Sequence, residues 1–294
     1  MGVHVKVASM RGIARRILSC IGRLRPDESL IKPDESLINR VEWAERRISE
    51  LSLVTSPPSS GGTYCALSGD DTQIEVYVSQ FNIRWIADFG VDPKVILDIG
   101  SFDGGDGIRL KRAFPSSRVV SFEADPNRFR IVAGNVAPFG VEPVQLALSD
   151  RDGSTEWYQS HDNSFVSKGN GSQGSIFRHS EKYRLRFPHI DQTSVPISVN
   201  CGRLDTFCGR AGIDHIDLAH IDVEGAEYEV IMGMGSINPK IIFVEALSTA
   251  SELWIGARDS REVHRLLSRR GYIFAGDFTS DRLYVRCDVL GDVP

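Results

Sequence analysis

KVILDIGSFDGGDGIRLKRAFPSSRVVSFEADPNRF, residues 94–129, decides the fold. A short apolar run, 95–97, ends at Asp98, and a loop with four glycines follows it. Apolar residues at helical spacing over 108–114 then lead to a second apolar run, which ends at Glu123. The order strand, loop, helix, strand predicts two parallel strands. Because ligands of such sheets bind outside the carboxyl ends of the strands, where an acid can reach a ribose, the stretch predicts a nucleoside site.

The spacing of the glycines argues against a dinucleotide-binding site. The pattern G-x-G-x-x-G, which lets the backbone approach a pyrophosphate, fails here because its second glycine position is Phe102. The pattern D-x-G-x-x-x-G that stands instead resembles motif I of the Rossmann-like S-adenosylmethionine-dependent methyltransferases. This resemblance implies a loop packed on the methionine part of the cofactor and a Glu123 that holds both ribose hydroxyls; a glycine turn without a ligand is the alternative. The residues it assigns to the cofactor are Asp98, Gly100, Ser101, Gly104, Glu123 and Ala124.

Composition places the chain among soluble globular proteins. Its 294 residues, 41% hydrophobic and 25% charged, suffice for one large α/β domain with an extension or for two small domains. The net charge of −5 argues against general nucleic-acid binding. Five scattered cysteines without a CxxC pair indicate neither a disulfide framework nor a zinc site, so a reducing cytoplasm is expected. No apolar run approaches the roughly 18 to 20 residues of a membrane span.

The N-terminal segment differs from the rest in charge. Residues 1–25 hold six Lys and Arg and no acid, and apolar residues recur at helical spacing from 13 to 24. Three interpretations remain open: a basic amphipathic helix over 10–25 at an anionic membrane surface, a mitochondrial presequence, or a basic extension without such a role. The sequence TSPPSSGG reads as a linker. We therefore expect an extension and linker over 1–62 and one catalytic domain over 63–294.

A third apolar strand is expected over 142–148, followed by the sequence SDRDG. In the methyltransferases whose motif I this chain resembles, the tip of the third strand borders the adenine. This resemblance makes Ser149 and Asp150 candidate contacts of the adenine base. A hairpin turn at Asp152-Gly153 is the alternative. The long polar stretch 160–192 is expected to be a substrate-facing insertion or a surface loop.

A second group of acids follows two later strands. An apolar strand ends at Asp222, the turn behind it holds Glu224, and the next apolar strand ends at Glu245. His220 precedes Asp222 by two residues and so shares its strand face, which predicts a catalytic group of His220 as base and Asp222 as its orienter, with Glu224 as a third catalytic candidate. Alternatively, carboxylates such as Asp222 and Glu245 could hold Mg²⁺. A third interpretation gives these acids structural roles, with Glu224 capping the following helix.

The ordered series DIGSFDGGDG, SFEADP, ALSDRDG, LDTF, IDVEGAE and IIFVEA resembles the FkbM family of methyltransferases over roughly residues 75–290. The resemblance implies a Rossmann-like α/β fold: a mostly parallel seven-stranded sheet with a C-terminal antiparallel hairpin and helices on both faces. It also implies S-adenosylmethionine as methyl donor and O-methylation of a hydroxyl in a small natural product, sugar or glycan. His220 stands where the family usually has Lys. A noncatalytic cofactor-binding protein and a nicotinamide-dependent oxidoreductase are the alternatives.

Overall fold

The computed structural model describes residues 62–67, 73–79, 83, 86, 89–163, 173–278 and 280–289. The expected extension and its basic segment 10–25 therefore lie outside the described residues, and the domain boundary stays a prediction. Within the described part of the chain, no helix has the length and apolar character needed to cross a membrane.

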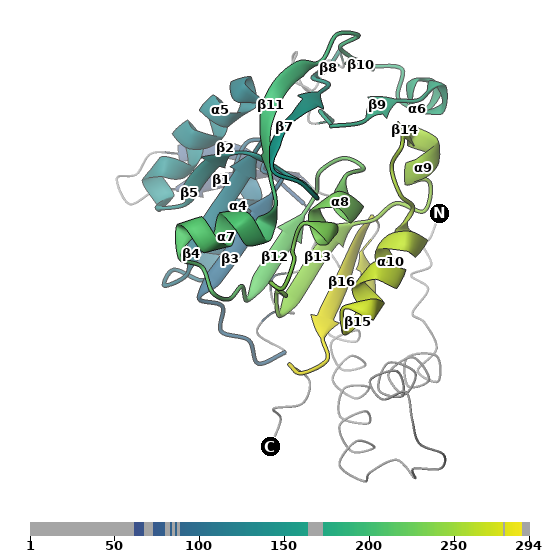
Figure 1. Cartoon of the computed structure of the whole chain (residues 1–294). Coiled ribbons are helices and arrows are strands. Elements are labelled where there is room, and N and C mark those ends of the chain that lie inside the picture. Colours follow the sequence, from purple (N-terminus) through teal and green to yellow (C-terminus); the bar gives the residue numbers. More distant parts are fainter. Residues whose placement is uncertain are drawn as a thin grey trace, which may run out of the picture.

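One seven-stranded sheet forms the centre of the fold (Figure 1). Its strands are β3 (Val95–Ile99), β4 (Arg118–Glu123), β5 (Glu142–Gln145), β12 (Leu218–Ile221), β13 (Ile241–Glu245), β15 (Tyr272–Phe278) and β16 (Asp281–Arg286). They lie in the order β15-β16-β13-β12-β3-β4-β5. The strands from β13 to β5 pair in parallel, and β16 runs antiparallel to both neighbours. This arrangement confirms the expected fold class.

Helices cover both faces of this sheet. Successive side chains of a strand point to opposite faces, and here both faces are apolar, so both need to be covered. Ile96 packs in one core with residues of α4 (Gly105–Ala113) and α5 (Pro126–Val136), which the short helix η1 (Ala137–Phe139) follows. Leu97 packs in a second core with residues of three other helices. Those helices are α7 (Leu204–Ala211), α8 (Glu227–Met232) and α10 (Ser260–Arg269). Near-continuous apolar strands buried on both faces are what a parallel sheet requires.

Small elements lie beyond the carboxyl ends of the parallel strands and form what we term the cap, at the top of Figure 1. The cap strands are β6 (Ala147–Leu148), β7 (Gly153–Trp157), β8 (Ser160–Asp162), β9 (Arg178–His179), β10 (Ile190–Gln192), β11 (Ile197–Gly202) and β14 (Trp254–Ile255). Its helices are α6 (Glu181–Arg186) and α9 (Ala250–Leu253). A separate antiparallel pair, β1 (Gly62–Leu67) and β2 (Gln73–Val78), lies beside α4.

The cap corrects two sequence expectations. The strand predicted over 142–148 is divided, because only β5 joins the main sheet while β6 pairs with β11. The hairpin considered at Asp152-Gly153 is wrong, because β7 pairs with β11, whose paired residues lie forty to forty-eight positions later, and not with a neighbouring strand. The stretch 160–192 is also more ordered than a loop, since it holds β8, β9, α6 and β10; residues 164–172 lie outside the described residues.

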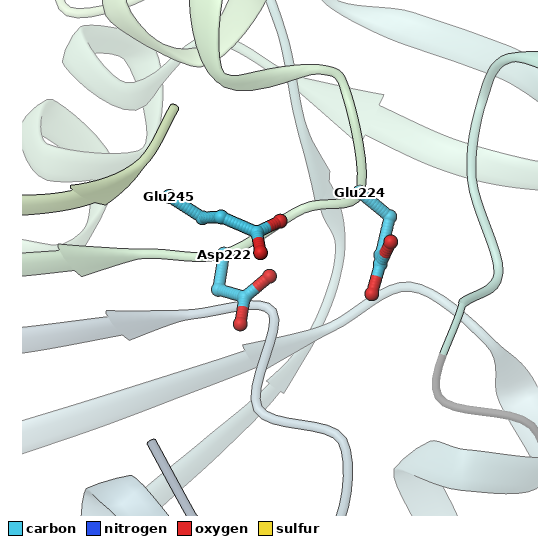
Figure 2. Close-up of side chains that lie close together, drawn as sticks. All are labelled: Asp222, Glu224 and Glu245. Atoms are coloured by element: carbon cyan, nitrogen blue, oxygen red, sulfur yellow. The ribbon is translucent and has the colours of Figure 1, made fainter. Parts of the chain in front are cut away.

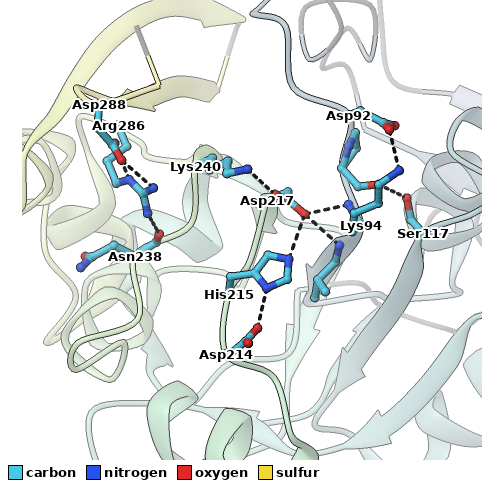
Figure 3. Close-up of polar contacts among 12 residues, drawn as sticks. Asp92, Lys94, Ser117, Asp214, His215, Asp217, Asn238, Lys240, Arg286 and Asp288 are labelled. Atoms are coloured by element: carbon cyan, nitrogen blue, oxygen red, sulfur yellow. Dashed lines mark hydrogen bonds and ion pairs between the residues drawn. The ribbon is translucent and has the colours of Figure 1, made fainter. Parts of the chain in front are cut away.

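A buried carboxylate fixes the opposite ends of the strands (Figure 3). Asp217, which is 1% exposed, accepts hydrogen bonds from the backbone N–H groups of Lys94 and Val95 at 2.7 and 3.0 Å. It also pairs with Lys240 Nζ at 2.9 Å. Because these residues precede or begin β3, β12 and β13, one side chain holds three neighbouring strands in register. Their other ends carry the candidate site.

Candidate active site

The loop between β3 and α4 turns tightly because of its glycines. Gly100 has a φ of 90°, and a Cβ there would lie 1.7 Å from the carbonyl oxygen of Asp222. Gly100 and Ser101 both donate their N–H groups to the carbonyl oxygen of Phe122, at 3.1 and 2.9 Å. Gly104, also at a φ of 90°, begins α4 where a Cβ would meet Val136 at 2.5 Å. Glycine is thus required at 100 and 104 by backbone conformation and by close packing.

A cleft opens beside this loop, at the carboxyl ends of β3 and β4. The space between its walls, counting the part that is open to solvent, is about 650 Å³. Main-sheet and cap elements both contribute to its walls. Its described lining residues are Ile99, Gly100, Phe102, Phe122, Glu123, Ala124, Asp125, Arg128, Leu146, Ala147, Leu148, Trp157, Ser160, Gly174, Ile176, Asp222, Val223, Glu224 and Ala226.

Glu123 is the best-positioned acid for a ribose. Its side chain is 6% exposed, and its two carboxylate oxygens accept the backbone N–H groups of Phe102 and Asp125 at 3.0 and 2.8 Å. A carboxylate has about four acceptor positions, so each oxygen can still accept one hydroxyl. Burial, together with the charge of Asp125, raises the pKa of Glu123 to about 7 against the lowering effect of these hydrogen bonds.

The walls around Glu123 are mostly apolar and suit a planar base. Arg128 lies over the ring of Phe102, with its guanidinium carbon 4.3 Å from the ring centroid. Trp157 and Ile176 contribute apolar surface from the cap. The side chain of Gln159 donates to Asp125 at 2.8 Å and so ties the cap to the start of α5. Apolar walls with few fixed polar groups are typical of small-molecule sites.

Asp98 differs from its expected place near the ligand. Its side chain is 0% exposed and does not line the cleft. It accepts hydrogen bonds from Ser101 and Ser121 at 2.8 and 2.9 Å, and it pairs with His220 Nδ1 at 3.0 Å. Because Ser101 follows Gly100, the observed effect of Asp98 is to hold the glycine loop from behind. Ser101 likewise contributes its backbone to the turn while its hydroxyl points away from the cleft.

His220 also differs from the prediction. Sequence spacing paired it with Asp222, but the structure pairs it with Asp98, which stands opposite His220 in the parallel register of β12 and β3. His220 is 1% exposed, so it lies in the core between the sheet and α4. Burial lowers the pKa of His220, but the bond to Asp98 outweighs it and the pKa rises to about 9. The bond to Asp98 thus favours the charged imidazolium and directs Nδ1 away from Asp222, so the predicted pairing of His220 with Asp222 is not formed.

Three carboxylates do converge at the tips of β12 and β13. Figure 2 shows the side chains of Asp222, Glu224 and Glu245 pointing toward one another. One oxygen from each lies within 4.8 Å of the others, and all three side chains are partly exposed. Burial, together with nearby acids, Asp281 first, raises the pKa of Asp222 to about 7 against the opposing charge of His220. Burial also raises the pKa values of Glu224 and Glu245 well above normal.

Glu224 does not cap α8, whose N-cap is Ala226 without a side-chain cap, and the turn before the helix is held by another residue. Glu227, which is 3% exposed, accepts the backbone N–H groups of Val223 and Gly225 at 3.2 and 3.0 Å. Glu224 instead has a φ of 54°, and its carbonyl accepts the hydroxyl of Ser175 from the cap at 2.8 Å. Its carboxylate is therefore left to face the site.

Ser149 and Asp150 lie away from the cleft. Ser149 is 1% exposed, and its N–H donates to the carbonyl of Gly202 on β11. Asp150 is exposed and pairs with Arg151. The cleft wall at this point comes from Leu146, Ala147 and Leu148, because the strand turns into the cap before residue 149.

Sequence reasoning missed part of the cleft. Asp125 caps α5 by accepting the N–H of Asn127 at 2.7 Å, and the Asp-Pro pair before the helix was a usable signal for it. Phe102 was read only as a break in a glycine pattern, although it has a positive φ of 55° and lines the cleft. Trp157 and Ile176 gave no sequence signal, because the cap brings them there.

Comparison with known proteins decides the family. The sequence model of the "Methyltransferase FkbM domain" matches residues 98–274, a span that includes the glycine loop, Glu123 and the three-carboxylate cluster. The chain belongs to the FkbM methyltransferase family. As a member of this family it is an S-adenosylmethionine-dependent methyltransferase, and the resemblance seen in its motifs is confirmed.

Two relatives that are similar in sequence agree with this assignment. The chain is 34% identical over 181 residues to the 2-O-methyltransferase NoeI of Sinorhizobium fredii, covering 60% of this chain and 71% of that protein. It is 24% identical over 204 residues to methyltransferase sdnD of Sordaria araneosa, covering 64% and 75%. Among solved structures, the O-methyltransferase TomG from Streptomyces achromogenes in complex with S-adenosylmethionine aligns over 95% of this chain and 99% of its own, at 15% identity and a TM-score of 0.39.

Proposed function

We propose that this FkbM methyltransferase transfers the methyl group of S-adenosylmethionine to a hydroxyl of a small natural product, a sugar or a glycan. One observation carries the proposal: Glu123 and Asp222 line the same cleft, the first beside the apolar walls and the second at the three-carboxylate cluster. A nucleoside site and a group that can take a proton thus share one cavity. The name of NoeI, a 2-O-methyltransferase, supports oxygen as the atom methylated.

In this proposal the cofactor lies along the glycine loop. Glu123 accepts the two ribose hydroxyls on the acceptor positions that its backbone partners leave open. The adenine packs between the apolar wall at Leu146 to Leu148 and Trp157. The backbone at Gly100 approaches the methionine part, as a residue without Cβ allows, and Asp98 acts from behind the loop by fixing Ser101.

S-adenosylmethionine supplies the methyl group, and the chain positions the acceptor and takes its proton. The acceptor oxygen must approach in line with the sulfur–methyl bond, so holding it at the carboxylate cluster lowers the barrier. As the new carbon–oxygen bond forms and the sulfur–methyl bond breaks, the hydroxyl proton passes to the Asp222 carboxylate. The raised pKa of Asp222, about 7 because of burial, suits a base that works near neutral pH.

Transfer of a labelled methyl group tests the proposal. The protein is incubated with methyl-tritiated S-adenosylmethionine and a panel of monosaccharides, oligosaccharides and small alcohols, with matched amine and thiol acceptors. We expect label in at least one hydroxylated acceptor, as a base-stable methyl ether. Label in amines alone, or binding of S-adenosylmethionine without transfer to any acceptor, contradicts O-methylation. Tight binding of NAD by a protein that does not bind S-adenosylmethionine contradicts the proposed cofactor site as well.

A further inference from the structure

The cluster of Asp222, Glu224 and Glu245 has the geometry of a set of metal ligands, in addition to containing the proposed general base. Asp222 and Glu245 end neighbouring parallel strands, because Ile221 and Val244 pair in the register of β12 and β13. Glu224 reaches the same point from the turn before α8. One oxygen of each carboxylate lies within 4.8 Å of the other two, and the three side chains converge in Figure 2.

A fourth carboxylate stands behind this cluster. Asp281 begins β16 directly opposite Glu245 in the antiparallel register, so the two side chains lie on the same face. Its side chain is 4% exposed, and among the described residues no hydrogen bond or ion pair reaches its carboxylate. The charge of Asp281 acts on both Asp222 and Glu245. A buried, unpartnered carboxylate is costly unless something positive satisfies it.

The basic groups that face these acids are already engaged. His220 pairs with Asp98 at 3.0 Å. Arg109 lies 3.4 Å from Asp106, and its guanidinium also donates to the carbonyl of Ser79 at 2.8 Å. The backbone turn at Gly225 donates to Glu227 and not to the cluster. Within the described chain, four carboxylates therefore share two cations that each serve another acid, and the site is short of positive charge.

We propose that Asp222, Glu224 and Glu245 bind one hard divalent cation of the Mg²⁺ and Mn²⁺ class, with Asp281 adding negative charge behind them. Hard cations prefer carboxylate oxygens, and Mg²⁺ holds them at about 2.0–2.1 Å, so ligand oxygens on opposite sides of the ion stand about 4.2 Å apart. Oxygens at adjacent positions of the ion stand about 3 Å apart, so the three carboxylates, whose oxygens lie within 4.8 Å of one another, would draw closer together to share one ion. Three protein ligands leave positions for water and for an acceptor oxygen.

The binding itself does not depend on methyl transfer, but its catalytic role rests on the proposed function. An acceptor hydroxyl on the ion would lose its proton more easily, because a bound cation lowers the pKa of a coordinated hydroxyl. Partial exposure of the three carboxylates gives the ion a path from solvent.

Titration of the EDTA-treated full chain with MnCl₂, followed by the electron paramagnetic resonance signal of free Mn²⁺, tests this site. We expect one bound Mn²⁺ per chain with micromolar affinity. Glu245→Gln and Asp281→Asn should each weaken binding at least tenfold, the first by removing a ligand and the second by removing charge. Glu181→Gln, the same chemical change at an exposed position on α6, should bind Mn²⁺ like the wild type.

Thermal unfolding with and without Mn²⁺ keeps the test independent of variant folding. Mn²⁺ should raise the melting temperature of the wild type and of Glu181→Gln, because an ion that binds the folded state stabilises it. It should not raise that of Glu245→Gln. The inference is overturned if the wild type binds no Mn²⁺ at millimolar concentration, or if Glu245→Gln binds it equally well. Methyl transfer that survives without bound Mn²⁺ overturns the catalytic role of the ion alone, whereas Mn²⁺ binding without transfer to any acceptor contradicts the proposed function alone.

Discussion

Asp222→Asn should lower kcat for methyl transfer by about 10² to 10⁴-fold while the affinity for S-adenosylhomocysteine changes only a few-fold. Asparagine has the shape of aspartate, so the contact between the Asp222 backbone and Gly100 persists. Its amide cannot take a proton, and general-base catalysis is typically worth a factor of this size. The variant also weakens the proposed cation site, which acts in the same direction. Initial rates at saturating cofactor and acceptor give the value.

The matched control is Asp214→Asn, the same substitution at a side chain that is 93% exposed and lies at the opposite ends of the strands. It should leave kcat unchanged. If Asp222→Asn kept near-normal kcat with intact cofactor binding, Asp222 would be neither base nor ligand, and the carboxylate cluster would have a structural role only.

Gly100→Ala should abolish cofactor binding, with at least a hundredfold loss of affinity for S-adenosylhomocysteine. Two physical costs combine at this position. A φ of 90° is unfavourable for any residue with a Cβ, by about 1–2 kcal/mol. The Cβ would also lie 1.7 Å from the carbonyl oxygen of Asp222, which only a backbone shift can relieve. Such a shift moves the loop and the strand end together, and both line the cleft.

Gly212→Ala separates the effect of an unfavourable backbone conformation from that of a steric clash of the added Cβ. Gly212 has a φ of 64° at the end of α7, and nothing lies within 4 Å of an added Cβ. This variant should lose about 1 kcal/mol of unfolding free energy and keep its cofactor affinity. Calorimetric titration and thermal unfolding measure both quantities. Wild-type affinity in Gly100→Ala would mean that the cofactor does not use this loop.

Local sequence patterns predicted the main sheet because each parallel strand is buried on both faces. The apolar runs before Asp98, Glu123, Asp222 and Glu245 identify β3, β4, β12 and β13, and the acids that follow them mark the end where ligands bind. Four glycines then located the turn. These features depend on neighbours in the chain, which is why they could be read without a structure.

Contacts between distant segments could not be read in this way. The pairing of His220 with Asp98 depends on β12 lying beside β3, whereas spacing along one strand pointed to Asp222. The cap combines strands whose paired residues lie forty to forty-eight positions apart, so its contributions to the cleft, Trp157 and Ile176, had no local signal. Glu224 does not cap α8, as was considered; instead the carboxylate of Glu227 accepts the N–H groups of Val223 and Gly225 in the turn before the helix, a contact that the spacing along the sequence did not indicate.

Calorimetric titration with S-adenosylhomocysteine at pH 8 and pH 6 tests the central claim, that Glu123 holds the cofactor ribose in this cleft. The pKa of Glu123, raised to about 7 by burial, makes the carboxylate mostly ionised at pH 8 and mostly protonated at pH 6. Because the ionised form accepts the ribose hydroxyls, affinity should fall about tenfold as the pH is lowered. Asp222 titrates in the same range, so Glu123→Gln isolates the effect: it should bind weakly and equally at both values. Micromolar, one-to-one binding that weakens at pH 6 only in the wild type is the predicted result; no binding at pH 8, or wild-type affinity in Glu123→Gln, would contradict the account.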